Sequence, residues 1–153
     1  MLSSLQKSVR WVWQTMPRGL RLAVARVTQT KFTVSAAGII TNDAGDVLLL
    51  NHILRPESGW GVPGGFVGSG EQAEDGLRRE IREETGIELK NVQLYRIRTR
   101  LRHIEMFFLA EGVGTASVLS REISELGWFA IDKMPAEMSL DQQFLVRKAL
   151  GVD

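Results

Sequence analysis

The chain has 153 residues, of which 44% are apolar, and it contains no cysteine. This length and composition predict one globular domain with a hydrophobic core. The lack of cysteine excludes disulfides, thiolate metal sites and a cysteine nucleophile, and we expect a cytoplasmic protein. The net charge of +1 is unevenly distributed, because residues 1–31 hold six basic side chains and no acidic one, which leaves a net charge of −5 on residues 32–153.

No apolar run approaches the length of about 18 residues that spans a bilayer, so we expect no transmembrane helix. A secretory signal peptide is also not expected, because Lys7, Arg10 and Pro17 interrupt the apolar groups near the start. An acid-free, amphipathic start would suit an organelle transit peptide if the source were eukaryotic.

Residues 1–30 form a basic arm, which we predict to fold as two short amphipathic helices joined near Pro17. Apolar residues recur at helical spacing on both sides of the junction: Leu5, Val9, Val12, Trp13 and Met16, then Leu20, Val24 and Val27. The simplest interpretation is that the arm packs on residues 31–153 or on a second subunit in a homodimer. Peripheral contact with an anionic membrane, or with nucleic acid, is the alternative, because basic amphipathic helices bind both.

Residues 31–153 begin with a strand-rich segment. The apolar runs FTVSAAGIIT and DVLLLNHI, separated by Asn42–Gly45, predict a β-hairpin. A Gly/Pro-rich loop, RPESGWGVPGG, then leads into a predicted helix over Ala73–Thr85, which Gly86 would end as a left-handed C-cap.

The remaining residues predict further strands and a closing helix. The segment from Val92 to Val113 reads as one or two strands, and ELGWFAI reads as another. The last helix is capped by Ser139 or Asp141. Several strands with few helices between them indicate an α/β fold, in which helices cover a mixed sheet.

Three glutamates crowd one face of the helix predicted over residues 73–85. Since successive helical residues turn by about 100°, Glu80, Glu83 and Glu84 fall within one arc of about 100°. Leu77 and Ile81 lie on the opposite side, where they can bury against a sheet. An acidic, solvated surface is the plain interpretation of such a face, with nearby arginines balancing its charge.

A divalent cation explains the carboxylate cluster better than its arginines do. Arg79 could pair with Glu83 at i+4, but that contact is worth only a few tenths of a kcal/mol. Mg²⁺ and Mn²⁺ prefer carboxylate and carbonyl oxygens and usually bind beside substrate phosphates. Gly64 and Gly65 would let the backbone approach such a ligand closely. The charges alone therefore favour metal-assisted phosphate chemistry.

The same stretch resembles the signature of the Nudix hydrolases: glycine, five residues, glutamate, seven residues, then Arg-Glu-aliphatic-any-Glu-Glu-any-Gly-aliphatic. Every fixed position is filled, by Gly65, Glu71, Arg79, Glu80, Ile81, Glu83, Glu84, Gly86 and Ile87. The resemblance extends over roughly residues 32–150 and leaves the arm outside it. It implies a Nudix-type α/β/α sandwich and Mg²⁺- or Mn²⁺-dependent hydrolysis of a diphosphate linked to another group, commonly a nucleoside.

The resemblance also implies roles for individual residues. Glu83 and Glu84 would be the main metal ligands, with the carbonyl of Gly65, or that of Gly64, as a further ligand. Glu80 would bind a second ion or act as the base that orients the attacking water. Arg79 would be an orienting partner, whose candidate contact is Glu71 at the N-terminus of the helix. The physical reason is that a diphosphate repels a nucleophile, and metal ions with positioned charges lower that barrier.

Many members of the family place another catalytic carboxylate after this motif, before a strand with an aromatic pair. Glu122, six residues before Trp128, is our candidate, and Glu125 is the second choice. A solvated loop charge is the alternative.

The substrate is less clearly indicated. Arg96, Arg98, Arg100 and Arg102 alternate, so on a single strand they would share one face and could bind a phosphate-rich partner such as a nucleoside triphosphate or an RNA 5′ end. A solvated sheet face, or a turn near Thr99, would remove that role. Trp60 could stack on a base or fill the core.

Two functional classes follow from the resemblance. The first is a pyrophosphohydrolase acting on a nucleoside triphosphate, dinucleoside polyphosphate, nucleotide sugar or RNA 5′ end. The second is a module that senses a nucleotide or ADP-ribose without turnover, against which the intact set of glutamates argues.

Overall fold

The computed structural model describes residues 3–55 and 58–152. The chain divides into two compact units, Met1–Phe32 and Thr33–Asp153.

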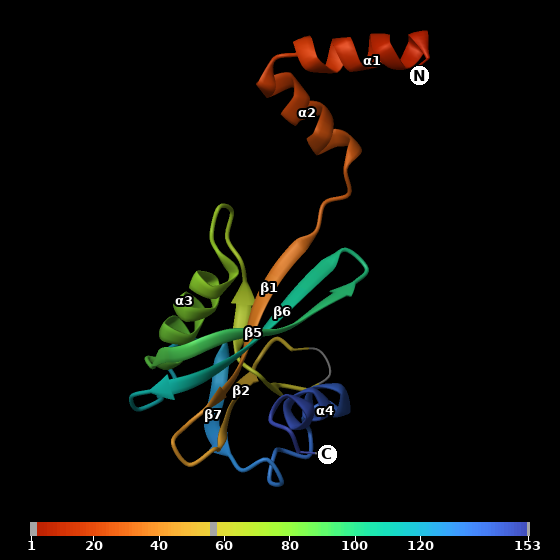
Figure 1. Ribbon diagram of the computed structural model, residues 1–153. Helices are drawn as coiled ribbons and strands as arrows, with labels where there is room; N and C mark the ends of the chain where they lie inside the picture. The colour runs from red at the N-terminus through yellow and green to blue at the C-terminus, as the bar shows by residue number, and fades with distance from the viewer. Residues whose placement is uncertain (1–2, 56–57, 153) are drawn as a thin grey trace. The chain divides into compact units, whose positions relative to one another are not determined.

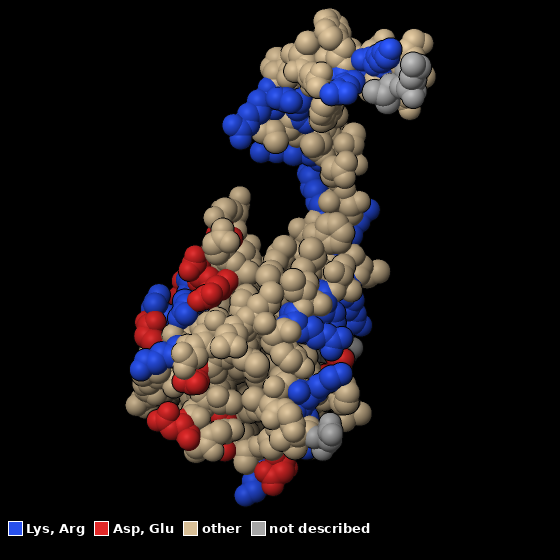
Figure 2. Space-filling model, in the orientation of Figure 1, with Lys and Arg blue, Asp and Glu red and all other residues tan. Residues whose placement is uncertain are grey.

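The first unit consists of two helices on either side of Pro17, as predicted. They are α1 (Ser4–Thr15) and α2 (Arg18–Thr28). Ser3 caps α1 through a reciprocal pair of hydrogen bonds with Gln6, which satisfies two free N–H groups at the helix start. Neither helix contains a buried residue. Figure 2 shows basic and no acidic side chains on the visible face of this unit.

The second unit is built on a mixed sheet of seven strands, which confirms the predicted sheet type (Figure 1). The strands are β1 (Thr33–Thr41), β2 (Val47–His52), β3 (Trp60–Gly61), β4 (Gly64–Phe66), β5 (Glu88–Arg100), β6 (His103–Val113) and β7 (Ile123–Phe129). Their main order is β3-β2-β1-β6-β5, with β4 also paired to β1 and β7 to β2. The β1–β6 pair is parallel and the other pairs are antiparallel.

Helices α3 (Ala73–Thr85) and α4 (Leu140–Ala149) contribute to two separate hydrophobic clusters on the sheet (Figure 1). Alternation along β1 sends Ile40 into the cluster that contains Leu77 of α3, and Ile39 into the cluster that contains Leu145 of α4. The result is the expected α/β/α sandwich. Burial of each large apolar side chain contributes roughly 1.5–3 kcal/mol to holding these helices in place.

The predicted hairpin between β1 and β2 forms only at its turn. The two strands are antiparallel but their register contains a single pair, Thr41 with Val47. Beyond that pair β2 bonds to β7 and β3, so the edge of β1 is free to bond to β4. Residues 88–113 form two strands, joined by a turn in which Leu101 has a φ of 53°.

The predicted ends of α3 and the predicted N-cap of α4 agree with the structure. Helix α3 covers the predicted residues, and Gly86 ends it in the left-handed conformation. Of the two cap candidates for α4, Ser139 accepts the hydrogen bond, from the N–H of Gln142. Within the described residues, no helix is both long enough and apolar enough to cross a bilayer.

Candidate active site

The glycine pair at the start of β4 brings the backbone against the glutamate face of α3. Gly65 pairs with Ala36 of β1, and Gly64 pairs with Ala37. Gly64 has a φ of 148°, and a Cβ there would overlap the Ala36 carbonyl. A Cβ on Gly65 would overlap the carboxyl group of Glu80. Position 64 therefore requires glycine, whereas a side chain at position 65 would displace the Glu80 carboxyl group, which now rests directly on the β4 backbone.

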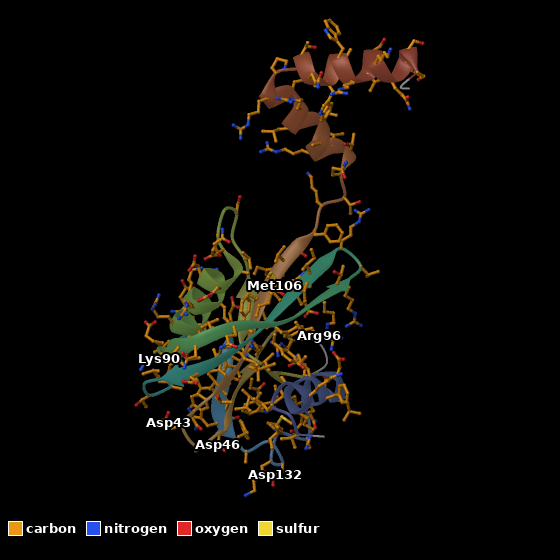
Figure 3. All side chains as sticks on the ribbon, viewed as in Figure 1. Asp43, Asp46, Lys90, Arg96, Met106 and Asp132 are labelled. Carbon is orange, nitrogen blue, oxygen red and sulfur yellow. The ribbon has the colours of Figure 1, made fainter. Side chains whose placement is uncertain are left out.

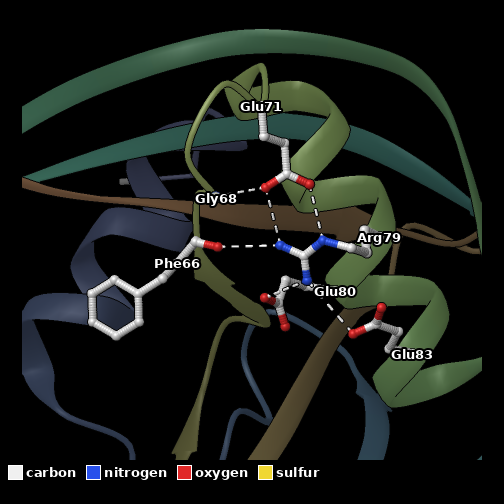
Figure 4. Close-up of polar contacts among 6 residues, drawn as sticks. All are labelled: Phe66, Gly68, Glu71, Arg79, Glu80 and Glu83. Atoms are coloured by element: carbon white, nitrogen blue, oxygen red, sulfur yellow. Dashed lines mark hydrogen bonds and ion pairs between the residues drawn. The ribbon is translucent and has the colours of Figure 1, made fainter.

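Arg79 lies at the centre of a hydrogen-bond network that links α3 to the preceding loop (Figure 4). Its guanidinium donates to both carboxylate oxygens of Glu71, at 2.9 and 3.1 Å, and to the carbonyl of Phe66 at 3.2 Å. It also donates to Glu80 at 2.8 Å and lies 3.5 Å from a carboxylate oxygen of Glu83. Arg79 thus positions two of the three clustered glutamates, and the i+4 contact predicted with Glu83 is the longest of its ion pairs.

Glu84 differs from its neighbours because it is buried, with 6% of its surface exposed. Its Oε2 atom has no hydrogen-bond partner among the described residues. Burial, together with the charges of Glu80, Glu122 and Glu83, raises the pKa of Glu84 to about 7, although the charge of Arg55 opposes this shift. Burying a carboxylate oxygen without a hydrogen-bond partner costs folding free energy, so the position of Glu84 indicates a use for that oxygen.

Two backbone hydrogen bonds between segments that are distant in sequence bring Glu122 close to this site. The N–H of Leu119 donates to the carbonyl of Glu84, and the N–H of Ile53 donates to the carbonyl of Glu122. These two bonds hold the loop before β7 between α3 and the end of β2, and place Glu122 within electrostatic reach of Glu84. Glu125 instead lies on β7, opposite Asn51, and is exposed.

No sequence pattern indicates two further residues of the site, Arg55 and His52. The Arg55 guanidinium donates to the carbonyl of Val62, while its buried Nη1 has no partner among the described residues. Burial lowers the pKa of Arg55, and Glu84 and Glu105 oppose that shift. Burial, with help from the charge of Arg55, lowers the pKa of His52 to about 4, so this imidazole is neutral near pH 7. His52 is the last residue of β2, and Arg55 lies in the loop that follows, whose residues show no periodic pattern.

A cavity of about 480 Å³ adjoins the glutamate cluster. Gly65, Arg55 and Glu122 line it, as do Phe66 and His103. His103 is held by the hydroxyls of Thr33 and Ser35, and its ring lies edge to face with Phe66, at a centroid distance of 5.8 Å. The cavity therefore combines charged groups with an aromatic pair, which is the mixture found in small-molecule sites.

The predicted substrate residues Trp60 and Arg98 lie beside a second, more open cavity of about 810 Å³. Trp60 packs edge to face on Phe129, with centroids 5.2 Å apart, and so also belongs to the core. Arg98 lines both cavities and already pairs with Glu105, at 2.8 Å, and with Asp141. Its charge is therefore largely balanced within the protein.

The predicted row of four arginines is interrupted by the turn after β5. Arg96, labelled in Figure 3, and Arg100 are exposed on the same strand as Arg98. Strand alternation places these three on one face. Arg102 follows the end of β5, because Leu101 turns the chain there. The set expected on one face is thus reduced to three.

Carboxylate oxygens are suitable ligands for a divalent cation, but the described carboxylates are not grouped around one common point. Among the described residues, no three His, Asp or Glu side chains are grouped as a ready metal site. The physical reason is that Arg79 holds Glu80 and Glu83 in ion pairs, while the Glu84 carboxylate is buried. The free Oε2 of Glu84 and the adjacent carboxylates are nonetheless the oxygen donors that Mg²⁺ and Mn²⁺ prefer.

Comparison with known proteins identifies the family of the chain. Residues 31–148 match the model of the NUDIX domain. The chain is 31% identical over 111 residues to a MutT-like protein of Streptomyces ambofaciens, covering 70% of each chain. It is 35% identical over 106 residues to an NAD-capped RNA hydrolase, NudC, of Pseudomonas putida, where the match covers 67% of this chain and 38% of that protein. The chain thus spans well under half of the NudC relatives that it matches.

Among solved structures, the fold is similar to a MutT NUDIX hydrolase from Burkholderia pseudomallei. The TM-score is 0.67 at 31% sequence identity, and the alignment covers 79% of this chain and 97% of that one. The domain match covers most of the chain, the sandwich is shared, and every fixed position of the glutamate motif is filled. The protein therefore belongs to the Nudix hydrolase family.

Proposed function

We propose that the protein is a Mg²⁺- or Mn²⁺-dependent pyrophosphohydrolase that cleaves a diphosphate linkage in a nucleoside-containing substrate. The observation that carries the proposal is the buried Glu84 carboxylate, whose Oε2 has no partner among the described residues. Glu84 lies within electrostatic reach of Glu80, and of Arg55 and Glu122 in the wall of a cavity of about 480 Å³. A group that costs folding energy is retained where it serves the reaction.

The metal would be held by Glu80, Glu83 and Glu84 with the carbonyl of Gly65. A divalent ion there neutralises charge on a diphosphate and makes a water molecule easier to deprotonate. Arg79 keeps Glu80 and Glu83 on the same side of α3. The β4 backbone supports the Glu80 carboxyl group from beneath, which limits the directions in which it can move.

The chain supplies its own groups for proton transfer and phosphate binding. Glu80 or Glu122 would take the proton of the attacking water on a carboxylate oxygen, since both lie close to Glu84. Arg55, a cation in the cavity wall with a free Nη1, would bind a phosphate oxygen of the substrate. His52 stays neutral beside it and adds no competing charge.

The two cavities offer different surfaces to the rest of the substrate. Phe66 has 66% of its surface exposed and, with His103, forms an aromatic wall that suits a nucleobase. Trp60 and Arg98 in the second cavity, with Arg96 on the same strand as Arg98, would contact a longer substrate, such as a nucleoside triphosphate or an RNA 5′ end. NudC of P. putida is named for activity on NAD-capped RNA, which supports including RNA among the substrates tested.

A substrate panel tests the proposal. We would measure Mg²⁺-dependent phosphate and mononucleotide release from nucleoside triphosphates, dinucleoside polyphosphates, nucleotide sugars, and NAD-capped or triphosphorylated RNA. We expect turnover of at least one class, and a loss of about 10³-fold in Glu84→Gln. The matched control is Glu74→Gln, which removes an exposed carboxylate from the first turn of the same helix.

Two outcomes would contradict the proposal. Near-normal turnover by Glu84→Gln would show that this carboxylate does not take part in the reaction. Tight binding of one panel member, with no turnover of any, would show that the protein is a nucleotide or ADP-ribose sensor.

A further inference from the structure

The helical arm formed by α1 and α2 has a surface that the proposed hydrolase reaction does not use. The NUDIX match begins at residue 31, after both helices. We propose that this arm binds peripherally to the surface of an anionic lipid membrane, with its apolar stripes in the interface and its basic side chains at the headgroups.

The first observation is an apolar stripe on α1 that the described residues of its own unit leave largely exposed. At about 100° per residue, Leu5, Val9 and Val12 lie within an arc of about 60°, and Trp13 lies about 40° beyond its edge. Leu5 and Val9 have 73% and 62% of their surfaces exposed. No residue of the helix is buried, although an apolar stripe of this width normally faces a core.

Helix α2 repeats the arrangement. Leu20, Val24 and Val27 share an arc of about 60°, and Val27 is 86% exposed. Arg21 and Arg26 flank the stripe on its two sides, about 60° and 100° beyond its edges. Long basic side chains at such flanks can lie along an apolar surface while their charged ends remain in water.

The positive charge of the arm indicates an anionic partner. The five basic residues of the arm are Lys7, Arg10, Arg18, Arg21 and Arg26, Lys31 follows it, and residues 1–31 contain no acid. Figure 2 shows the basic side chains of this unit among residues other than Asp and Glu. Lipid headgroups with negative charge complement this surface, and each basic side chain near such a surface strengthens binding by about five-fold.

Other occupants fit the surface less well. A second copy of the arm would bring together two sets of basic side chains without any acid, so like charges would oppose the apolar contact. A nucleic acid would neutralise the bases but would leave Leu5, Val9 and the other stripe residues in water. A lipid surface accommodates both features, and Trp13, between the stripe and Arg10, occupies the boundary position that tryptophan favours at membrane interfaces.

Vesicle binding by the full chain tests the inference. The probes are phosphatidylcholine vesicles with and without phosphatidylglycerol, read by co-sedimentation and by tryptophan fluorescence. We expect binding only to the anionic vesicles. Val9→Ser with Val12→Ser should weaken it by at least about ten-fold, and Arg21→Gln with Arg26→Gln by about 25-fold. Gln14→Ser, on the polar face of α1, is the matched control and should bind as the parent does. None of these residues belongs to the proposed active site, so hydrolysis of soluble substrates should stay unchanged.

Three results would overturn the inference. One is absent or equal binding to the two kinds of vesicle. Another is a dimer in sedimentation experiments that the valine substitutions dissociate, without vesicle binding, because the stripe would then cover a second copy. The third is single-stranded RNA binding that exceeds vesicle binding and ignores the valine substitutions. Circular dichroism of each variant with anionic vesicles distinguishes loss of a contact from loss of a helix, and the arginine variant keeps the stripe intact. Failure of these tests would leave the proposed hydrolase reaction unaffected.

Discussion

Arg79 and Glu71 form a two-point ion pair that closes the loop before α3 onto that helix. Nε lies 2.9 Å from Oε1 and Nη2 lies 3.1 Å from Oε2. The N–H of Gly68 donates to the same Oε2 at 2.7 Å. Three N–H groups therefore converge on one carboxylate, and the hydrogen bonds from Arg79, followed by that from Gly68, lower the pKa of Glu71 to about 2.

This pair predicts a specific pH dependence of stability. Since the pKa of Glu71 falls from 4.5 to about 2 on folding, its stabilising effect is complete above pH 4.5 and is lost as the pH falls towards 2. Glu71→Gln should therefore have a lower urea midpoint than the parent at pH 7. The difference should shrink below pH 4.5. Glu74→Gln, which loses only an exposed ion pair with Arg78, should change the midpoint little at either pH. A constant difference from pH 7 to pH 3 would contradict the prediction.

Glu84 should reduce the stability of the metal-free protein. Because its carboxylate is buried beside other negative charges, Glu84→Gln removes a charge that folding must desolvate. We expect a higher melting temperature for Glu84→Gln than for the parent in EDTA at pH 8, together with the loss of turnover proposed above. Differential scanning calorimetry measures the first effect. A lower melting temperature would show that the carboxylate stabilises the fold.

Gly65 and Glu80 should behave as a coupled pair. Gly65→Ala would push a methyl group into the space of the Glu80 carboxyl group, so turnover should fall by roughly 10²-fold while the sandwich stays folded. In a Glu80→Ala background the clash is gone, and adding Gly65→Ala should cost little more. Additive losses in this double-mutant cycle would mean that the glycine acts independently of Glu80.

Substitutions of Glu122 and of Glu125 distinguish a catalytic role from a general effect of surface charge. Glu122 lines the cavity beside Glu84, whereas Glu125 is exposed on β7. Glu122→Gln should lower kcat by roughly 10²-fold, as expected for loss of a proton acceptor. Glu125→Gln should match the parent. Equal effects of the two substitutions on kcat would remove Glu122 from the mechanism.

The parts of the fold that the sequence predicts are those fixed by local periodicity. The spacing of Leu77 and Ile81, together with Gly86, defines α3 because both signals lie within the helix itself. That same spacing fixes which way the three glutamates face. The helices of the arm follow equally from their apolar repeats and from Pro17.

Long-range pairing accounts for most of what could not be predicted. β1 pairs in parallel with β6, which follows it by some 70 residues, and no local pattern selects that partner. Arg98 is balanced by Glu105 and Asp141, which are distant enough in sequence that alternation within β5 could not reveal them. Arg55 lies in an irregular loop, so the burial of its guanidinium can be recognised only when the positions of β2, α3 and α4 are known.

The C-terminal helix α4 helps to anchor the segment that leads into β4. The Gln142 side chain, in the first turn of α4, accepts a hydrogen bond of 3.0 Å from the N–H of Val62, which immediately precedes Pro63 and the glycine pair. A segment 80 residues away thus anchors the backbone on which Glu80 rests. Truncations or fusions that loosen α4 would act on the reaction from the far side of the sheet, without altering any residue of the Nudix motif.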